Sequence, residues 1–136
     1  MTRTRILLFL ALSLFALGIS AAVGAENHVN VMLQPVNGSG ISGRVELTAL
    51  PKGGTMITGQ VMGLQPNTEY VSLYYDNHTC ELEPYSQDDI IAHYTASAAG
   101  RAEFHSKAGD DLDEINSISV RLASDFSLKA CADTHP

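Results

Sequence analysis

Apolar and polar residues alternate along most of the chain after residue 27, in short segments separated by turn-forming residues. The segment 41–50, ISGRVELTAL, places Ile41, Gly43, Val45 and Leu47 on one side and polar residues on the other. A period of two is expected of a half-buried β-strand. The pattern predicts about eight short strands, at residues 28–34, 41–50, 55–64, 68–76, 90–97, 101–108, 117–124 and 126–133.

Turn signals such as PVNGSG and LPKGG separate these segments about every dozen residues, and no helical periodicity lasts longer than one turn. Many short strands at regular spacing are typical of an antiparallel sandwich or a Greek-key β-barrel. We therefore expect an all-β fold of about eight antiparallel strands in one domain, residues 26–136.

The first 25 residues have the pattern of a secretory signal peptide. Arg3 and Arg5 precede an apolar run, ILLFLALSLFALGI, and small residues follow up to Ala25. A basic start, an apolar run of this length and a small-residue exit direct export and cleavage. We expect cleavage after Ala25 and a periplasmic or secreted protein without a membrane anchor; a retained N-terminal anchor is the alternative.

The acidic balance limits the kinds of partner. The net charge is -7, and it becomes more negative once the leader takes Arg3 and Arg5 with it. Nucleic acids and anionic membranes demand clustered Lys and Arg, so neither is expected as a partner. The run DDLDE at residues 110–114 is interpreted as a solvated loop, with a cation site as the alternative.

The two cysteines, Cys80 and Cys131, favour a disulfide, because an even count in an exported chain is typical of one. The alternative is a pair of thiols that bind a soft metal, for which the CxxC spacing is missing. Asn37 and Asn77 each begin an N-glycosylation sequon, which matters only in a host that glycosylates.

One local motif resembles the tyrosine corner of a fibronectin type III module. Leu64, Pro66, Thr68 and Tyr70 have its spacing, and the tyrosine there opens the penultimate strand. The chain before Leu64 is too short for five strands and there is no tryptophan. A fibronectin type III-like adhesion module is therefore the second interpretation.

The whole segment after the leader resembles the copper-zinc superoxide dismutase family. NVMLQPVNGSGISGRVEL is similar to its first hairpin, TGQVMGL to its strand ending in Gly-Leu, and YVSLYYDN to the strand before the disulfide cysteine. AHYTASAAGRAEF and SLKACA are similar to its later hairpin and its terminal strand. The resemblance implies a Greek-key β-barrel and places Cys80 and Cys131 at the family's intrasubunit disulfide.

The same resemblance implies that the metal site is lost. The family's His-x-His copper pair matches Ser72 and Tyr74, and its last copper histidine matches Arg121. Its active-site arginine is replaced by Leu128, and the segment ELEPYSQDDII has none of the histidines of the metal-binding loop. Copper of this kind favours imidazole nitrogen, so serine and tyrosine are poor substitutes.

Three remaining histidines are candidate metal ligands: His78, His93 and His105. His93 and His105 are nearly equidistant from the AAG turn, so a tight hairpin would place them across from each other. Two ligands make a weak site, and surface imidazoles are the alternative. No cofactor is expected, with copper or zinc at these histidines as the alternative.

We therefore expect an exported, non-catalytic superoxide dismutase-like domain that acts as a binding or structural module for another protein. The alternatives are a copper-binding protein, or a residual dismutase whose site is rebuilt from the three histidines. Five tyrosines are expected near the former metal site and suit an interface, with ordinary strand and loop packing as the alternative: Tyr70, Tyr74, Tyr75, Tyr85 and Tyr94. The sequence leaves the oligomeric state open.

Overall fold

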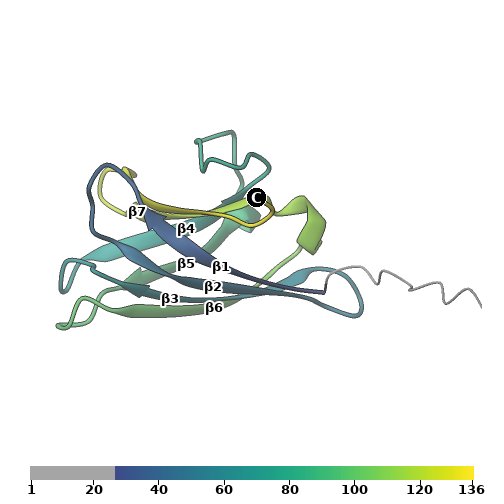
Figure 1. The fold of residues 1–136 in the computed structure, drawn as a ribbon, viewed down its shortest axis with the longest axis horizontal. Helices are drawn as coiled ribbons and strands as arrows, with labels where there is room; N and C mark the ends of the chain where they lie inside the picture. Colours follow the sequence, from purple (N-terminus) through teal and green to yellow (C-terminus); the bar gives the residue numbers. More distant parts are fainter. Residues whose placement is uncertain (1–26) are drawn as a thin grey trace, which may run out of the picture.

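The computed structural model describes residues 27–136 and shows eight antiparallel strands (Figure 1). Each predicted strand is confirmed to within a few residues, and two single-turn 3-10 helices lie in the connections. The elements are β1 (His28–Pro35), β2 (Ser42–Ala49), β3 (Thr55–Met62), β4 (Glu69–Tyr75), η1 (Gln87–Asp89), β5 (Ile90–Thr95), β6 (Ala102–Ala108), η2 (Leu112–Glu114), β7 (Ser117–Leu122) and β8 (Leu128–Asp133).

The strands form one sheet in the order β5-β4-β7-β8-β1-β2-β3-β6, which curls into a nearly closed barrel (Figure 1). The two end strands meet through side chains, because the rings of Tyr94 on β5 and Phe104 on β6 stack with centroids 5.4 Å apart. The prediction of an all-β, eight-stranded antiparallel fold is confirmed.

The prediction that residues 90–97 and 101–108 pair as a tight hairpin is wrong. The turn itself closes, since the Ser97 amide donates to the Arg101 carbonyl at 2.9 Å. Beyond the turn the strands separate: β5 pairs with β4, and β6 pairs with β3. His93 is therefore opposite Val71, and His105 is opposite Thr58.

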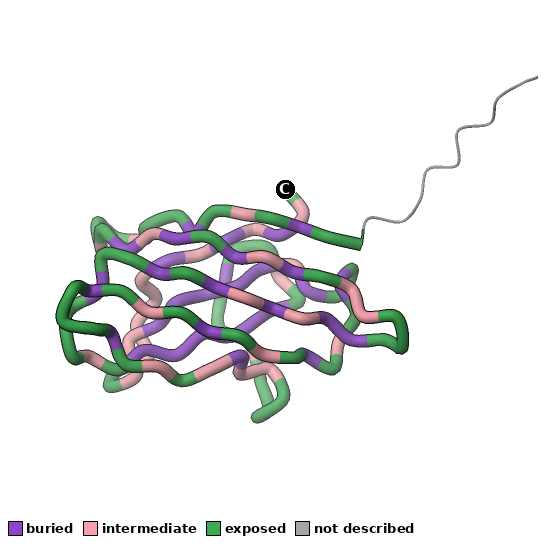
Figure 2. Tube along the Cα trace, turned by 90° about the horizontal axis from the view of Figure 1, so that it is seen from below, coloured by how far each residue is buried: buried purple, intermediate pink, exposed green. Residues whose placement is uncertain are grey.

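Two hydrophobic cores hold the sheet. The larger lies inside the barrel, where alternate residues such as Val45, Leu47 and Ile57 are fully buried; Figure 2 shows buried and exposed residues alternating along the strands. The smaller lies on the outer face of β4, where Val71, Leu73 and Tyr75 pack with Cys80 of the following loop. Strand β4 is thus buried on both faces after Glu69.

The tyrosine-corner contact exists in the structure. The hydroxyl of Tyr70 accepts a hydrogen bond from the Gln65 amide at 3.0 Å, as such corners do. Tyr70, however, lies on the fourth of eight strands instead of the penultimate one. The local motif therefore gives no support to a fibronectin type III arrangement.

The proposed signal peptide, residues 1–25, lies outside the described residues. Between residues 27 and 136, no helix has the length and hydrophobicity needed to cross a membrane.

The packing of β3 against β6 gives a first prediction. A Cβ at Gly59 would lie 2.1 Å from the Phe104 ring, which is itself buried against Tyr94. Gly59→Ala is therefore expected to lower the free energy of unfolding by about 1–3 kcal/mol through overpacking. Urea unfolding measures the change.

Gly109 supplies the matched control, because a Cβ there meets nothing within 4 Å. Gly109→Ala should change the free energy of unfolding by no more than about 0.5 kcal/mol. Equal effects of the two substitutions would contradict the close packing of Phe104 on β3.

Candidate functional site

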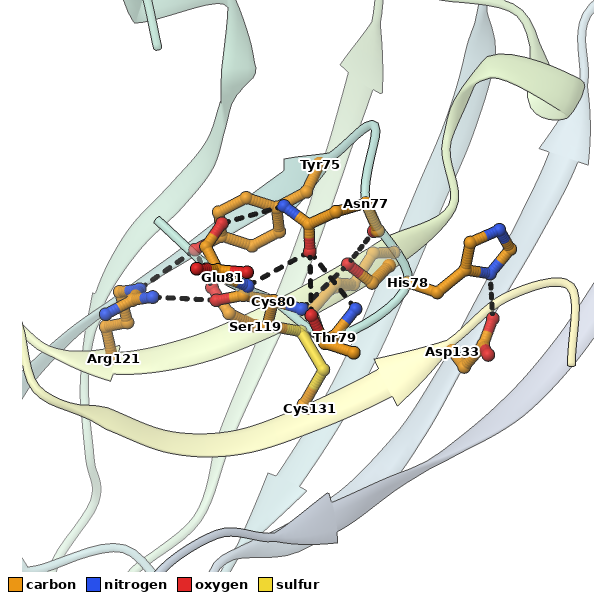
Figure 3. Close-up of a disulfide and its surroundings, with 12 residues drawn as sticks. Tyr75, Asn77, His78, Thr79, Cys80, Glu81, Ser119, Arg121, Cys131 and Asp133 are labelled. Carbon is orange, nitrogen blue, oxygen red and sulfur yellow. Dashed lines mark hydrogen bonds and ion pairs between the residues drawn. A yellow bond between two sulfur atoms is a disulfide. The ribbon is translucent and has the colours of Figure 1, made fainter. Parts of the chain in front are cut away.

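The segment between β4 and β5, residues 76–89, forms a loop over the outer face of β4, β7 and β8. We call it the disulfide loop, because Cys80 in it is bonded to Cys131 on β8, with an S–S distance of 2.03 Å (Figure 3). Cys80 is fully buried. The predicted disulfide is confirmed, and it is consistent with a location outside the cytoplasm.

The bridge joins residues 51 positions apart. In the loop-entropy description a crosslink of this span destabilises the unfolded chain by about 4 kcal/mol. The disulfide loop is therefore held at a fixed place on the sheet.

Arg121 on β7 lies beneath the disulfide loop and is almost completely buried (Figure 3). Its guanidinium donates three hydrogen bonds: Nε to the Tyr75 hydroxyl at 2.9 Å, Nη1 to the Phe126 carbonyl at 2.7 Å and Nη2 to the Cys80 carbonyl at 2.8 Å. The Phe126 ring lies 5.5 Å from the guanidinium carbon, a cation–π distance. None of the ion pairs found within residues 27–136 involves Arg121.

Both carbonyls that Arg121 binds belong to residues with left-handed backbone. The φ angle is 56° at Cys80 and 61° at Phe126, values that cost a non-glycine residue about 1–2 kcal/mol. Hydrogen bonds to a cation are among the stronger ones in proteins. Arg121 therefore stabilises two unfavourable turns at once, one in the disulfide loop and one between β7 and β8.

Hydroxyl groups fill the rest of the contact between the disulfide loop and the outer face of β4 and β7. The hydroxyls of Tyr75 and Ser119 are 2.8 Å apart, and Ser117 donates to the Asn77 carbonyl at 2.6 Å. Ser117 also accepts from the Cys80 amide at 3.2 Å. No buried side-chain polar atom in residues 27–136 is left without a partner. The outer face of β7 is thus packed and internally satisfied.

The side chain of Asn77 organises the disulfide loop from within. Its Oδ1 accepts from the amides of Thr79 and Glu81 at 3.1 and 3.0 Å, and its Nδ2 donates to the Glu81 carbonyl and to Glu83. The Asn77 sequon therefore has a structural role in the folded chain. Asn37, the other sequon residue, is exposed in the turn after β1.

The two positions matched to the copper pair point into the barrel. The Ser72 hydroxyl lies 2.8 Å from the hydroxyl of Tyr94, and the Tyr74 hydroxyl donates to the Asp88 carbonyl at 3.1 Å. Burial raises the pKa of Tyr74, and the carboxylate of Asp110 raises it further. Burial also raises the pKa of Tyr94.

Arg121 faces the opposite way, since it pairs with Val71 and shares the outer face with Tyr75. Ser72, Tyr74 and Arg121 therefore do not form one site. The five tyrosines are divided in the same manner: Tyr70, Tyr74 and Tyr94 belong to the barrel core, and Tyr75 and Tyr85 lie on the side of the disulfide loop.

The three candidate histidines have separate partners. His78 lies 2.8 Å from Asp133, and this hydrogen bond lowers the pKa of the carboxyl. His93 lies 3.5 Å from Glu69, and His105 lies 2.9 Å from the Thr58 hydroxyl. Across the described part of the chain, no three or more His, Cys, Asp or Glu side chains are arranged to hold a metal ion.

The acidic run at residues 110–114 has a partly structural role. Asp111 accepts from the Gly54 amide at 2.8 Å, and Glu114 accepts from the Asp111 amide at 2.9 Å. Partial burial raises the pKa of Asp110, and the nearby carboxylates of Glu114 and Asp89 raise it further. This run and the disulfide loop therefore place their negative charges close together.

The solvent side of the disulfide loop carries two large apolar residues among these charges. Leu82 is 50% exposed and Tyr85 is 46% exposed, and the Tyr85 ring stacks on Phe126 with centroids 5.7 Å apart. The loop also carries five carboxylates and no Lys or Arg: Asp76, Glu81, Glu83, Asp88 and Asp89. Exposed apolar side chains on a loop that the disulfide and Arg121 hold in place are suited to contact another protein.

The sequence alone did not predict the contact between Arg121 and the disulfide loop. The one available signal was a charged residue in the middle of the apolar segment SISVRLAS. A buried arginine needs several acceptors, and these come from β4, the disulfide loop and the turn after β7. Only the folded chain brings them together.

A scan against protein-family models finds no family that matches the chain, and a search of curated proteins finds no match either.

The Arg121 contacts give a second prediction. Arg121→Met removes all three donors and leaves the Cys80 and Phe126 carbonyls without them, so the free energy of unfolding should fall by about 2–4 kcal/mol. Arg101→Met, at an exposed position, is the control and should change it by no more than about 0.5 kcal/mol. A similar small effect of both substitutions in urea unfolding would contradict the role of Arg121.

The buried Tyr94 phenol gives a third prediction. Because burial raises its pKa above the ordinary value of 10.0, the folded protein holds this proton to higher pH than the unfolded chain does. The contribution of Tyr94 to the free energy of unfolding should therefore be constant up to about pH 10 and fall above it. Tyr94→Phe should make that fall shallower; equal slopes for both proteins in urea unfolding across this range would contradict the assignment.

Proposed function

We propose that this chain is an exported, non-catalytic β-barrel domain of the superoxide dismutase-like type, which binds a protein partner through the outer surface of the disulfide loop. The carrying observation is the pair of exposed side chains, Leu82 and Tyr85, on a loop that the Cys80–Cys131 bridge and Arg121 hold from below. A preorganised loop loses little conformational entropy on binding.

The resemblance to the dismutase family is supported by the order of the strands and by the place of the disulfide. The bridge joins the loop after the fourth strand to the last strand, as the resemblance implies. The alternative of a copper site rebuilt from His78, His93 and His105 requires these side chains to converge, whereas each has a separate partner.

The charge of the loop indicates the kind of partner. Leu82 and Tyr85 lie on a loop that carries five carboxylates, and no Lys or Arg lies between residues 76 and 89. The carboxylate of Asp110 adds negative charge near Asp76 and Asp89 of the same loop. Electrostatic complementarity steers oppositely charged partners and repels like-charged ones. The proposed partner is therefore a protein with a basic surface around an apolar patch.

A fourth prediction tests the interface. The exported protein is crosslinked in its native compartment, and the crosslinked partner is compared between wild type, the double variant Leu82→Ser with Tyr85→Ser, and Met62→Ser. Met62 is the matched control, because it is 49% exposed on the distant β3. The same partner should be recovered with wild type and Met62→Ser and lost with the double variant.

Retention of the partner by the double variant would place the interface elsewhere, and recovery of no partner by wild type would remove the proposal. Metal content and superoxide-dismuting activity are measured on the same oxidised protein after incubation with copper and zinc. We expect neither bound metal nor activity; one retained equivalent of copper would contradict the non-catalytic assignment and direct attention to His78, His93 and His105.

A further inference from the structure

A second surface lies where β1 and β8 separate. The two strands pair only at Gln34 with Cys131 and at Pro35 with Ala130. From there toward its first residue, β1 runs away from the C-terminal strand, as Figure 1 shows. Among the described residues, the first three-quarters of β1 thus have a sheet neighbour on one side alone, which is β2.

We call the side of β1 that faces β8, from His28 to Met32, the free edge. The hydrogen bonds of the neighbouring residues show which backbone groups lie along it. The Asn27 carbonyl accepts from Ala49 on β2, and the Val36 amide donates to Lys129 on the side of β8. Successive residues of a strand direct their backbone groups to opposite neighbours. The amides and carbonyls of His28, Asn30 and Met32 therefore point toward β8, where the described residues provide no ladder partner for them.

One hollow lies along the free edge, and a second begins beside Asn27, just before the first residue of β1. One has a volume of about 400 Å³ and is lined by Val29, Asn30, Val31, Thr134, His135 and Pro136. The other, about 560 Å³, includes Asn27, Asp111, Asp113 and His135 in its lining. His135 belongs to both, so together they continue from β1 to η2. The space beside the edge is therefore large enough for the side chains of an added strand.

We propose that the free edge of β1 from His28 to Met32 accepts one extended, lysine- or arginine-bearing segment of another protein, which adds to the sheet as a further strand. Unpaired strand edges bind extended peptides through main-chain hydrogen bonds, and neighbouring hollows select the side chains. This site goes beyond the proposed function, because it is separate from Leu82 and Tyr85.

Charge decides between a foreign segment and a second copy of the chain. Residues 26–136 carry six Lys and Arg against fifteen Asp and Glu, a net charge of -9. Pairing β1 with β1 of a second copy would bring together two molecules of the same negative charge, which repel each other. A basic segment instead gains the carboxylates of Asp111 and Asp113 in the adjoining hollow.

The probe for the fifth prediction is a capped peptide of roughly nine residues with alternating lysine and valine, a usual length for one strand. Two comparison peptides replace lysine by glutamate, or carry N-methyl groups on alternate amides so that strand pairing is blocked and charge is kept. Hydrogen exchange of the amides of His28, Asn30 and Met32 is followed by NMR, together with the dissociation constant.

The lysine peptide should bind and slow exchange at these three amides by about tenfold or more, and both comparison peptides should bind at least about tenfold more weakly. Asn30→Pro removes an amide that β2 does not use, so the protein should fold and its affinity for the peptide should fall. Asn30→Ala keeps that amide and separates the backbone contribution from the side chain.

Equal binding of the N-methylated and parent peptides by wild type would show attraction by charge alone and overturn the proposal. So would equal affinity of Asn30→Pro and Asn30→Ala, or no slowing at the three amides. Slowing that depends on protein concentration without peptide would identify a second copy as the occupant, which also overturns it. The double variant at Leu82 and Tyr85 should bind the peptide as wild type does, so the two proposals fail independently.

Discussion

The packing of the disulfide loop and of the β7–β8 turn on the outer face of the sheet depends on one buried positive charge. Arg121 is withdrawn from solvent without an acidic partner in the described chain, and each of its three nitrogens donates one hydrogen bond, to the Tyr75 hydroxyl and the carbonyls of Phe126 and Cys80. Burying a charge costs desolvation energy, which hydrogen bonds from the protein must offset. The need to satisfy Arg121 therefore fixes both turns that cover the sheet, and the disulfide prevents the loop from leaving.

This arrangement changes what the outer face of β4 and β7 can do. Tyr75, Ser119 and Arg121 fill it with groups that bond to one another, so the surface offered to solvent is the disulfide loop instead of the sheet. Leu82 and Tyr85 then become the most exposed apolar groups of that region. The proposed binding role follows because the disulfide loop, and not the face of the sheet, is exposed to solvent on this side.

The sheet itself fails to close at two places, with different results. Between β5 and β6 the gap is sealed by Tyr94 and Phe104, which stack where no ladder forms. Between β1 and β8 no aromatic pair of residues 27–136 covers the divergence, and a hollow remains beside Asn30 and His135. The first seam stabilises the barrel, and the second leaves a strand edge with hydrogen-bonding capacity.

The sequence determined the eight strands and the cysteine pair, because alternation and turn residues act over a few neighbours, as in segment 41–50. It could not determine which face of β4 holds Ser72 and Tyr74, since both faces are buried and alternation disappears. Nor could it show that His93 and His105 would take different sheet neighbours, or that Arg121 would meet Cys80. Strand pairing and burial depend on segments far apart in the chain, so only the tertiary structure decided them.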